Sequence, residues 1–182
     1  MRRVLRRPGL FAELAAGLPV ADPIVRLRAA DAMEKITALR PALLRPHRGA
    51  LLRLAAREAQ QEVRWHLAQM IPRLALSPRQ RRAAEALLRR WLADPSRIVQ
   101  VATLQALADL SRGDPGREAR MARLIRRRMR TGGPAVRARG RRLLRELGGG
   151  PRPRASVAAN QAGRGAAGAR RRPWHGLGRP RA

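Results

Sequence analysis

The chain of 182 residues contains no cysteine, no tyrosine, one phenylalanine and only 12 acidic residues. Because cysteine is absent, disulfide bonds and thiolate chemistry are excluded, which suits a reducing compartment. No stretch approaches the roughly 20 apolar residues that a membrane-spanning helix needs. No segment of useful length alternates apolar and polar residues, so we expect no β-strand. The sequence therefore predicts an all-α protein that is soluble and cytoplasmic.

Motifs of catalysis are also missing. The sequence has no nucleophile elbow, phosphate-binding loop, zinc-protease motif or dinucleotide-binding fingerprint. Glu62 and His66 lie four residues apart on one predicted helix face and offer two metal ligands, whereas a stable zinc site needs three or four. We interpret this pair as a contact on a helix surface and predict a non-enzymatic protein without a metal or cofactor.

The first residues, MRRVLRRPGLFAELAAGL, place basic residues before an apolar run, as an export signal does. Glu13 interrupts the run, which is short and amphipathic. We therefore expect a first helix here instead of a signal peptide.

One helical pattern occurs four times along the chain. Its copies align on valines separated by 38, 36 and 37 residues, with apolar residues recurring about four, seven, eight and eleven positions later. These valines are Val25, Val63, Val99 and Val136. That stripe is typical of one face of an α-helix, and a period of this length is typical of stacked helix pairs.

Helix starts can be placed before three of the four copies. Asp22–Pro23, Asp94–Pro95 and Gly133–Pro134 each combine a residue suited to the N-cap with a proline suited to the first turn. Gly140 lies inside the last copy, where glycine costs about 1 kcal/mol relative to alanine. We expect this copy to form a polar end-cap whose helix frays.

A second helical segment precedes each copy, which predicts four helical hairpins. Ser77 begins a capping box followed by an apolar face that includes Trp91, and Asp114–Pro115 begins another helix. The earlier partners are a short segment from 10 to 18 and a stretch from 41 to 58, which we expect Pro46 to kink or divide. Trp91 and Trp65 occupy apolar positions, so we predict that both pack against neighbouring helices.

The pattern DP-x-VR-x-x-A-A-x-A, followed by a hydrophobic residue, spans 22–33 and resembles HEAT repeats of the armadillo-type superhelix. The resemblance covers roughly residues 9 to 147. It implies a short right-handed α-solenoid of about four HEAT-like hairpins, as a domain over 1–147. In that family the valine packs inward and the following arginine joins polar contacts between adjacent repeats. Arg26, Arg64 and Arg137 occupy that arginine position, and Gln100 departs from it.

Positive charge is concentrated toward the C-terminus. The chain has 41 basic residues and a net charge of +29, of which residues 114–182 carry +17. Like charges three or four residues apart on a helix repel by a few tenths of a kcal/mol per pair. Such a surface favours a polyanion as partner. The candidate polyanion-binding residues are Arg120, Arg123, Arg127, Arg137, Arg141, Arg170, Arg171 and Arg172.

Residues 148–182 form a tail rich in arginine, glycine, proline and alanine, without helical periodicity. Such a composition buries too little apolar area to offset its ordering entropy, so we expect disorder. Its arginines, with Trp174 and His175, suit contact with RNA or DNA. A solvated tail of biased composition is the alternative interpretation.

Three functional hypotheses follow. The first is a non-enzymatic HEAT-like scaffold or adaptor that presents a concave surface to a protein partner. The second is an electrostatic, sequence-independent nucleic-acid binder that uses the arginine-rich fourth repeat and the tail. The third is an enzyme, since some DNA glycosylases that act on alkylated bases, and a bilin lyase, resemble HEAT arrays.

Overall fold

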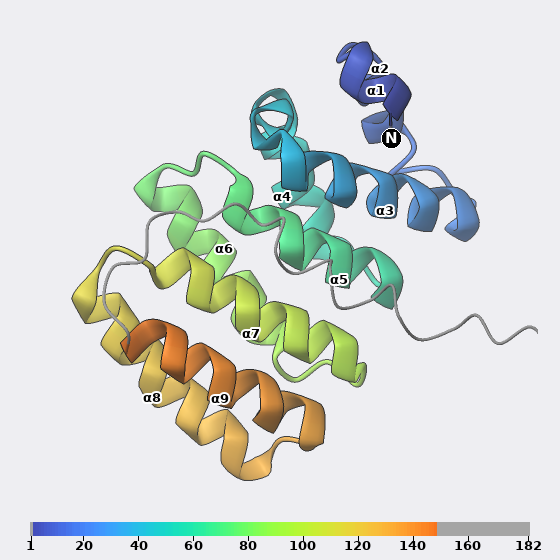
Figure 1. Ribbon diagram of the computed structural model, residues 1–182. Coiled ribbons are helices and arrows are strands. Elements are labelled where there is room, and N and C mark those ends of the chain that lie inside the picture. Colours follow the sequence, from blue (N-terminus) through green and yellow to red (C-terminus); the bar gives the residue numbers. More distant parts are fainter. Residues whose placement is uncertain (1, 149–182) are drawn as a thin grey trace, which may run out of the picture.

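The computed structural model describes residues 2–148, and within that range every regular element is helical (Figure 1). The predicted all-α class is therefore confirmed for these residues, and none of them forms a strand. The elements are α1 (Arg2–Arg6), α2 (Leu10–Ala16), α3 (Pro23–Leu39), η1 (Pro41–His47), α4 (Arg48–Arg57), α5 (Gln61–Met70), η2 (Ile71–Arg73), α6 (Pro78–Trp91), α7 (Arg97–Ser111), α8 (Pro115–Thr131) and α9 (Pro134–Gly148). The predicted tail of 148–182 lies, apart from Gly148, outside the described residues.

Side-chain caps set three of the helix starts. Asp22 Oδ1 accepts hydrogen bonds from the backbone N–H groups of Ile24 and Val25 at the start of α3. At α6, Ser77 and Gln80 form both bonds of the predicted capping box. Asp114 Oδ1 accepts from Arg117 N at 2.9 Å at α8. Each of these helices also has a proline in its first turn, so the predicted starts are confirmed.

The predicted start at Asp94 is wrong. Helix α7 begins at Arg97, with Ser96 as its N-cap residue. Asp94 is buried, and its Oδ1 accepts from Ser96 N at 2.8 Å. Two residues more than in the other copies separate Pro95 from the anchor valine, and they displace the aspartate from the cap.

Pro46 divides the stretch from 41 to 58, as predicted. It lies near the end of the 3₁₀-helix η1, and α4 begins two residues later at Arg48. Proline lacks the N–H that a continuous α-helix would need at this point.

The helices pack in two layers. In one row, α5 packs between α3 and α7, and α7 packs between α5 and α9 (Figure 1). The second layer consists of α4, α6 and α8. Helix α4 contacts α5 and α6, helix α6 packs on α7, and helix α8 packs on α7 and α9. Helix α2 packs on the first helix of the row. Consecutive helices thus form the pairs α2/α3, α4/α5, α6/α7 and α8/α9, called hairpins below.

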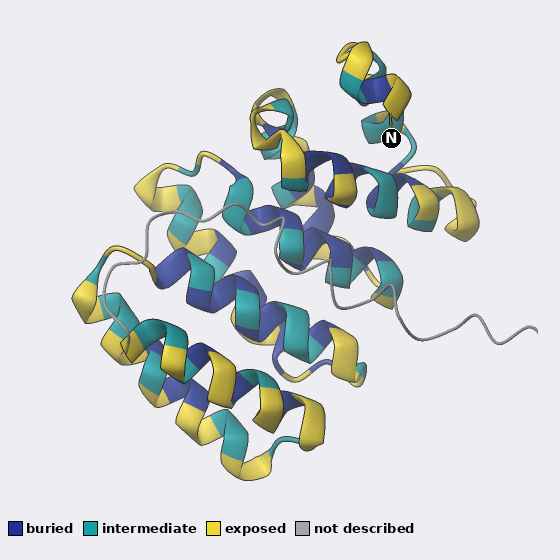
Figure 2. Ribbon diagram, in the orientation of Figure 1, coloured by how far each residue is buried: buried dark blue, intermediate teal, exposed yellow. Residues whose placement is uncertain are grey.

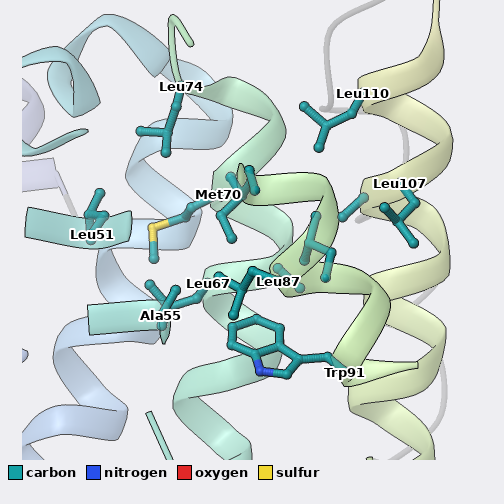
Figure 3. Close-up of a cluster of buried hydrophobic side chains, with 14 of the residues drawn as sticks. Leu51, Ala55, Leu67, Met70, Leu74, Leu87, Trp91, Leu107 and Leu110 are labelled. Carbon is teal, nitrogen blue, oxygen red and sulfur yellow. The ribbon is translucent and has the colours of Figure 1, made fainter. Parts of the chain in front are cut away.

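Buried side chains fill the space between the layers. Figure 2 shows buried residues on the facing sides of the helices and exposed residues on the outer sides. Figure 3 shows one cluster to which α4, α5, α6 and α7 all contribute, including Leu51, Leu67, Leu87 and Leu107. Truncating such a leucine to alanine costs about 2–5 kcal/mol. Neighbouring hairpins therefore stabilise one another through shared apolar contacts.

The first hairpin departs from the predicted pattern. Val63, Val99 and Val136 are buried, but Val25 is 44 % exposed. The partner helix α2 has only 7 residues, compared with 10 in α4, and it ends at Ala16. It is too short to cover the first turn of α3, so this anchor valine faces solvent.

Gly140 has a different role from the one predicted. It is buried where α9 crosses α8, and a Cβ at this position would lie 2.5 Å from Met129 Cγ and 2.6 Å from Met129 Sδ. The glycine therefore permits close packing of the two helices, and the helix continues past it to Gly148. Gly140 thus has a packing role that the sequence did not indicate, and the polar end-cap with a fraying helix stays a prediction.

None of the helices between residues 2 and 148 combines the length and apolar character required to cross a membrane.

Candidate binding surfaces

Two of the arginines that follow anchor valines link neighbouring hairpins. Arg26 of α3 donates through Nη2 to both carboxylate oxygens of Glu58, whose side chain is fully buried between α4 and α5. Arg64 of α5 donates through Nη1 to Asp94 Oδ2 at 2.5 Å and through Nε to the Glu58 carbonyl at 2.7 Å. A buried carboxylate is costly unless it is paired, and here each pairs with an arginine of the preceding hairpin.

The last two hairpins keep only part of this arrangement. Gln100 Nε2 donates to the Asp94 carbonyl at 2.6 Å, and Arg137 Nη1 donates to the Gly132 carbonyl at 2.7 Å. Gly132 has no space for a side chain, since a Cβ would lie 2.6 Å from the Arg128 carbonyl oxygen. The residue six positions before Arg137 is Thr131, so the fourth hairpin has no carboxylate at the place that Glu58 and Asp94 hold earlier.

The acidic partners of these arginines were not identified by the sequence analysis as ligands. Glu58 lies six residues before Arg64, and Asp94 lies six residues before Gln100. An acid at this fixed distance is the sequence signal that indicates the link.

A second polar network lies where α7 and α9 pack together. Arg112 bridges the two helices, donating to Asp109 Oδ1 at 3.2 Å and to Glu146 Oε2 at 2.8 Å. Burial acts to raise the pKa of Glu146, but hydrogen bonds from Arg142 and Arg112 outweigh it and lower that pKa. These residues are engaged within the fold, as is Arg139, which donates to Gln105 of α7.

The described candidate polyanion-binding residues lie on two helices. Arg120, Arg123 and Arg127 are exposed along the outer face of α8, and Arg137 and Arg141 are exposed on α9. Arg137 also donates to a backbone carbonyl of its own hairpin, which makes it partly structural. The remaining candidates, Arg170, Arg171 and Arg172, lie outside the described residues.

Arg128 does not belong to the exposed polar side of α8. It is half-buried, and its Nη2 donates to the Leu92 carbonyl beyond the end of α6. Arg126 and Arg130 instead extend the exposed face of the helix. Arg117, nearer the start, pairs with Asp114.

Large apolar side chains are exposed at the start of two helices in the row. Ile24 of α3 is 58 % exposed and Ile98 of α7 is 44 % exposed, and each directly precedes an anchor valine. Between them, Trp65 of α5 is half-buried and packs against the core. Trp91 is buried in the core, so the predicted packing of both tryptophans is confirmed.

Two neighbouring cavities of about 290 and 300 Å³ open between α2 and α4. Both are lined by Leu18, Leu54 and Arg57, and one also by Glu58 and Arg26. Glu58 is the carboxylate in these linings and is bound to Arg26, so it is not available as a general base.

His66 is buried, contrary to the predicted contact on a helix surface. It is 2 % exposed, and its Nε2 lies 3.8 Å from Asp31 Oδ1 of α3, whereas Glu62 is half-buried. Within residues 2–148, no group of three or more histidine or acidic side chains is placed to hold a metal ion.

A comparison of the chain with protein-family models, curated proteins and solved structures finds no match.

Proposed function

We propose that this chain is a non-enzymatic, HEAT-like scaffold that binds a protein partner along the row α3, α5 and α7. The observation that carries this proposal is the charge of the row. These three helices contain 5 basic and 4 acidic residues, although the chain has a net charge of +29. Cores of protein–protein interfaces are depleted in charged residues, and these three helices, with 9 charged residues among 42, are less charged than the whole chain at 29 %.

The links between hairpins support a stacked array. Arg26 and Arg64 each pair through a guanidinium nitrogen with a carboxylate of the next hairpin. The buried apolar side chains also continue from one hairpin to the next. Arrays of this kind present an extended surface on one layer of helices, and HEAT-like repeats are an example. A right-handed solenoid over residues 9–147 belongs to this proposal.

Ile24 and Ile98 provide the apolar contacts of the proposed surface. Each is about half exposed, and fully burying such a side chain contributes about 1.5–3 kcal/mol. Trp65 lies on the helix between them, and half-buried tryptophan is enriched among residues that dominate binding energy. A partner segment that crosses α3, α5 and α7 would contact all three.

The proposal is tested by affinity capture with the full chain, with and without nuclease treatment. A protein partner bound by this row remains after nuclease digestion. A double variant, Ile24→Glu and Ile98→Glu, should lose at least 90 % of that partner, because charges would be buried without counter-ions.

Leu39→Glu is the matched control. Leu39 is 53 % exposed at the opposite end of α3, so the same substitution leaves the proposed contacts intact. Loss of every partner on nuclease digestion, or equal loss in both variants, would contradict a protein-binding role for this row.

Nucleic-acid binding is a second candidate, favoured by the unpaired arginines of the fourth hairpin. Within residues 2–148, Arg123, Arg127 and Arg141 are exposed and form no ion pair. Phosphates would relieve the repulsion among these charges. This interface supplies affinity without base readout, so binding would be independent of sequence.

Salt dependence tests the second candidate. Affinity for duplex DNA should fall with a log–log slope of about −0.9 for each phosphate neutralised. Replacing Arg123, Arg127 and Arg141 by glutamine should make that slope shallower by about 1 for each phosphate contact removed. An unchanged slope would contradict binding at these arginines.

An enzymatic function has less support. A glycosylase-like site needs aromatic side chains and a free carboxylate on one surface. Trp91 is 6 % exposed in the core, and Glu58 and Asp94 are bound to arginines. We therefore propose a binding function without a catalytic step.

A further inference from the structure

The charge of the protein differs sharply between its two layers. Helices α4, α6 and α8 contain 15 basic and 2 acidic residues, whereas the other layer, α3, α5, α7 and α9, contains 10 and 5. A codon bias toward arginine would raise the arginine content along the whole chain. It would not make one layer of helices more basic than the other. The packing separates them, because α4, α6 and α8 form the second layer with their polar sides outward (Figure 2).

From this separation we propose that the layer α4, α6 and α8 is one continuous binding face for the phosphate backbone of a nucleic-acid duplex. The inference rests on the second candidate function, nucleic-acid binding, and extends its site beyond the fourth hairpin. It assigns a phosphate-binding role to six exposed arginines outside that hairpin: Arg53, Arg57, Arg79, Arg82, Arg89 and Arg90.

These six side chains are free to bind anions. None of them forms an ion pair with a residue between 2 and 148, unlike Arg26 and Arg64 of the row. The acidic residue within α6, Glu85, is half-buried, and α4 contains none between Arg48 and Arg57. A polyanion would therefore meet little repulsion on this face.

The dimensions suit a duplex. Helix α8 has 17 residues and is about 26 Å long, and neighbouring helices pack about 8–10 Å apart. Helices α4 and α6 are shorter, with 10 and 14 residues or about 15 and 21 Å, so the face is on the order of 20 by 20 Å. A duplex segment of that length has on the order of 12 phosphates, at one per roughly 1.7 Å of axis. Eleven arginines are exposed on the three helices.

The absence of aromatic side chains on this face favours a duplex over a single strand. Proteins that bind single strands stack bases on exposed aromatic residues. Trp91 is the aromatic residue of α4, α6 and α8, and it is buried in the core. Backbone contact without stacking matches a paired nucleic acid, whose bases are already stacked.

The test compares two quadruple variants of the full chain that remove equal charge. The first replaces Arg53, Arg57, Arg82 and Arg89 on the proposed face by glutamine. The second replaces four exposed arginines away from it, Arg2, Arg3, Arg6 and Arg28. Binding to a random-sequence DNA duplex of about 20 base pairs is measured by fluorescence anisotropy at several salt concentrations.

We expect the first variant to bind the duplex at least 10-fold more weakly at about 0.1 M salt, with a log–log slope shallower by about 3 to 4. The second variant should change affinity less than about 3-fold and leave the slope unchanged. Equal effects of the two variants would show that only net charge matters and would overturn the assigned face.

Two further outcomes separate this inference from the function on which it rests. If the Arg123, Arg127 and Arg141 variant weakens binding and the α4/α6 variant does not, the extended face is wrong and nucleic-acid binding stands. If neither changes binding, both fail. A loss confined to a single-stranded probe of the same length would overturn the duplex assignment.

Discussion

Gln100 and Thr131 depart together from the pattern that the earlier hairpins share. In the first two hairpins, Arg26 and Arg64 occupy the position of Gln100. Each pairs with a carboxylate of the next hairpin, Glu58 or Asp94. The fourth hairpin has Thr131 at the acid's place, six residues before Arg137, so no carboxylate is there. The neutral amide of Gln100 accordingly donates within its own hairpin, to the Asp94 carbonyl. The two residues thus avoid a buried charge without a partner.

Replacing Arg64 by methionine should destabilise the protein by about 2–4 kcal/mol, because Asp94 would remain buried without its counter-ion. The expected loss of stability is no larger than that for breaking a fully buried ion pair, because the Arg64 side chain is 25 % exposed. The free energy of unfolding from urea denaturation measures the effect. Adding Asp94→Asn to the variant should recover part of the loss, which a double-mutant cycle quantifies.

Lys35→Met is the control for this measurement. Lys35 pairs with Asp31 at 2.7 Å on the surface of α3, where both side chains are largely exposed. Such a pair contributes less than about 1 kcal/mol. If both substitutions cost the same, the link between hairpins has no special stabilising role.

Gly140→Ala should destabilise the protein by about 1–3 kcal/mol, although alanine is the better helix former. The added methyl group would overlap Met129 of α8 and also approach Ile125 Cγ2 to 3.2 Å. Gly148→Ala has open space in the same helix and should be neutral or slightly stabilising. Thermal unfolding of the two variants gives the comparison, and a stabilised Gly140→Ala would contradict close packing of α8 and α9.

Ser77→Ala should cost about 1 kcal/mol, because the N-cap hydroxyl accepts a hydrogen bond from Gln80 N. Ser96→Ala provides a matched control, since the Ser96 side chain makes no cap hydrogen bond at α7. Both serines are N-cap residues, but chemical denaturation should show a loss of stability for Ser77→Ala and no comparable loss for Ser96→Ala. Similar losses at both would show that the capping box does not stabilise α6.

Lowering the pH should destabilise the protein through His66. Burial lowers the pKa of His66 below its ordinary value of 6.5, with Lys35 acting in the same direction and Asp31 and Glu34 opposing it. As the pH falls below about 6.5, the unfolded chain binds a proton more readily than the folded chain, so the free energy of unfolding decreases.

His66→Gln should make that decrease smaller. The measurement is the melting temperature of each protein between about pH 7 and about pH 5, compared as a slope so that a change in overall stability does not matter. His47→Gln serves as the control. A slope that is unchanged in the His66 variant would contradict the lowered pKa.

The helical elements could be predicted from the sequence because their signals are local. The apolar stripes, the capping box at Ser77 and the break at Pro46 depend on residues within one or two turns. The capping box and the break appear at the predicted places, and the anchor valines of the stripes are buried except for Val25. The start of α7 was misplaced since Asp94 has the same residue type as a cap, but its carboxylate is used by Arg64, 30 residues away.

The non-local relations could not be predicted. Glycine inside a helix indicates weakness when it is read alone, and only the contact with Met129 makes Gly140 a packing residue. Arg128 belongs by its sequence neighbours to a charged surface, yet it reaches the Leu92 carbonyl of another hairpin. The separation of charge between layers likewise requires knowing which helices share a side.

The pairs Arg26–Glu58 and Arg64–Asp94 join only some of the neighbouring hairpins. They fasten the first three hairpins along one edge, whereas along that edge Gln100 makes no hydrogen bond or ion pair to the final hairpin within the described chain. We therefore expect hairpins one to three to move as a stiff unit. The joint between α7 and α9 is held instead by Arg112, which reaches Glu146, and by Arg139, which reaches Gln105, so different residues attach the last hairpin to the array.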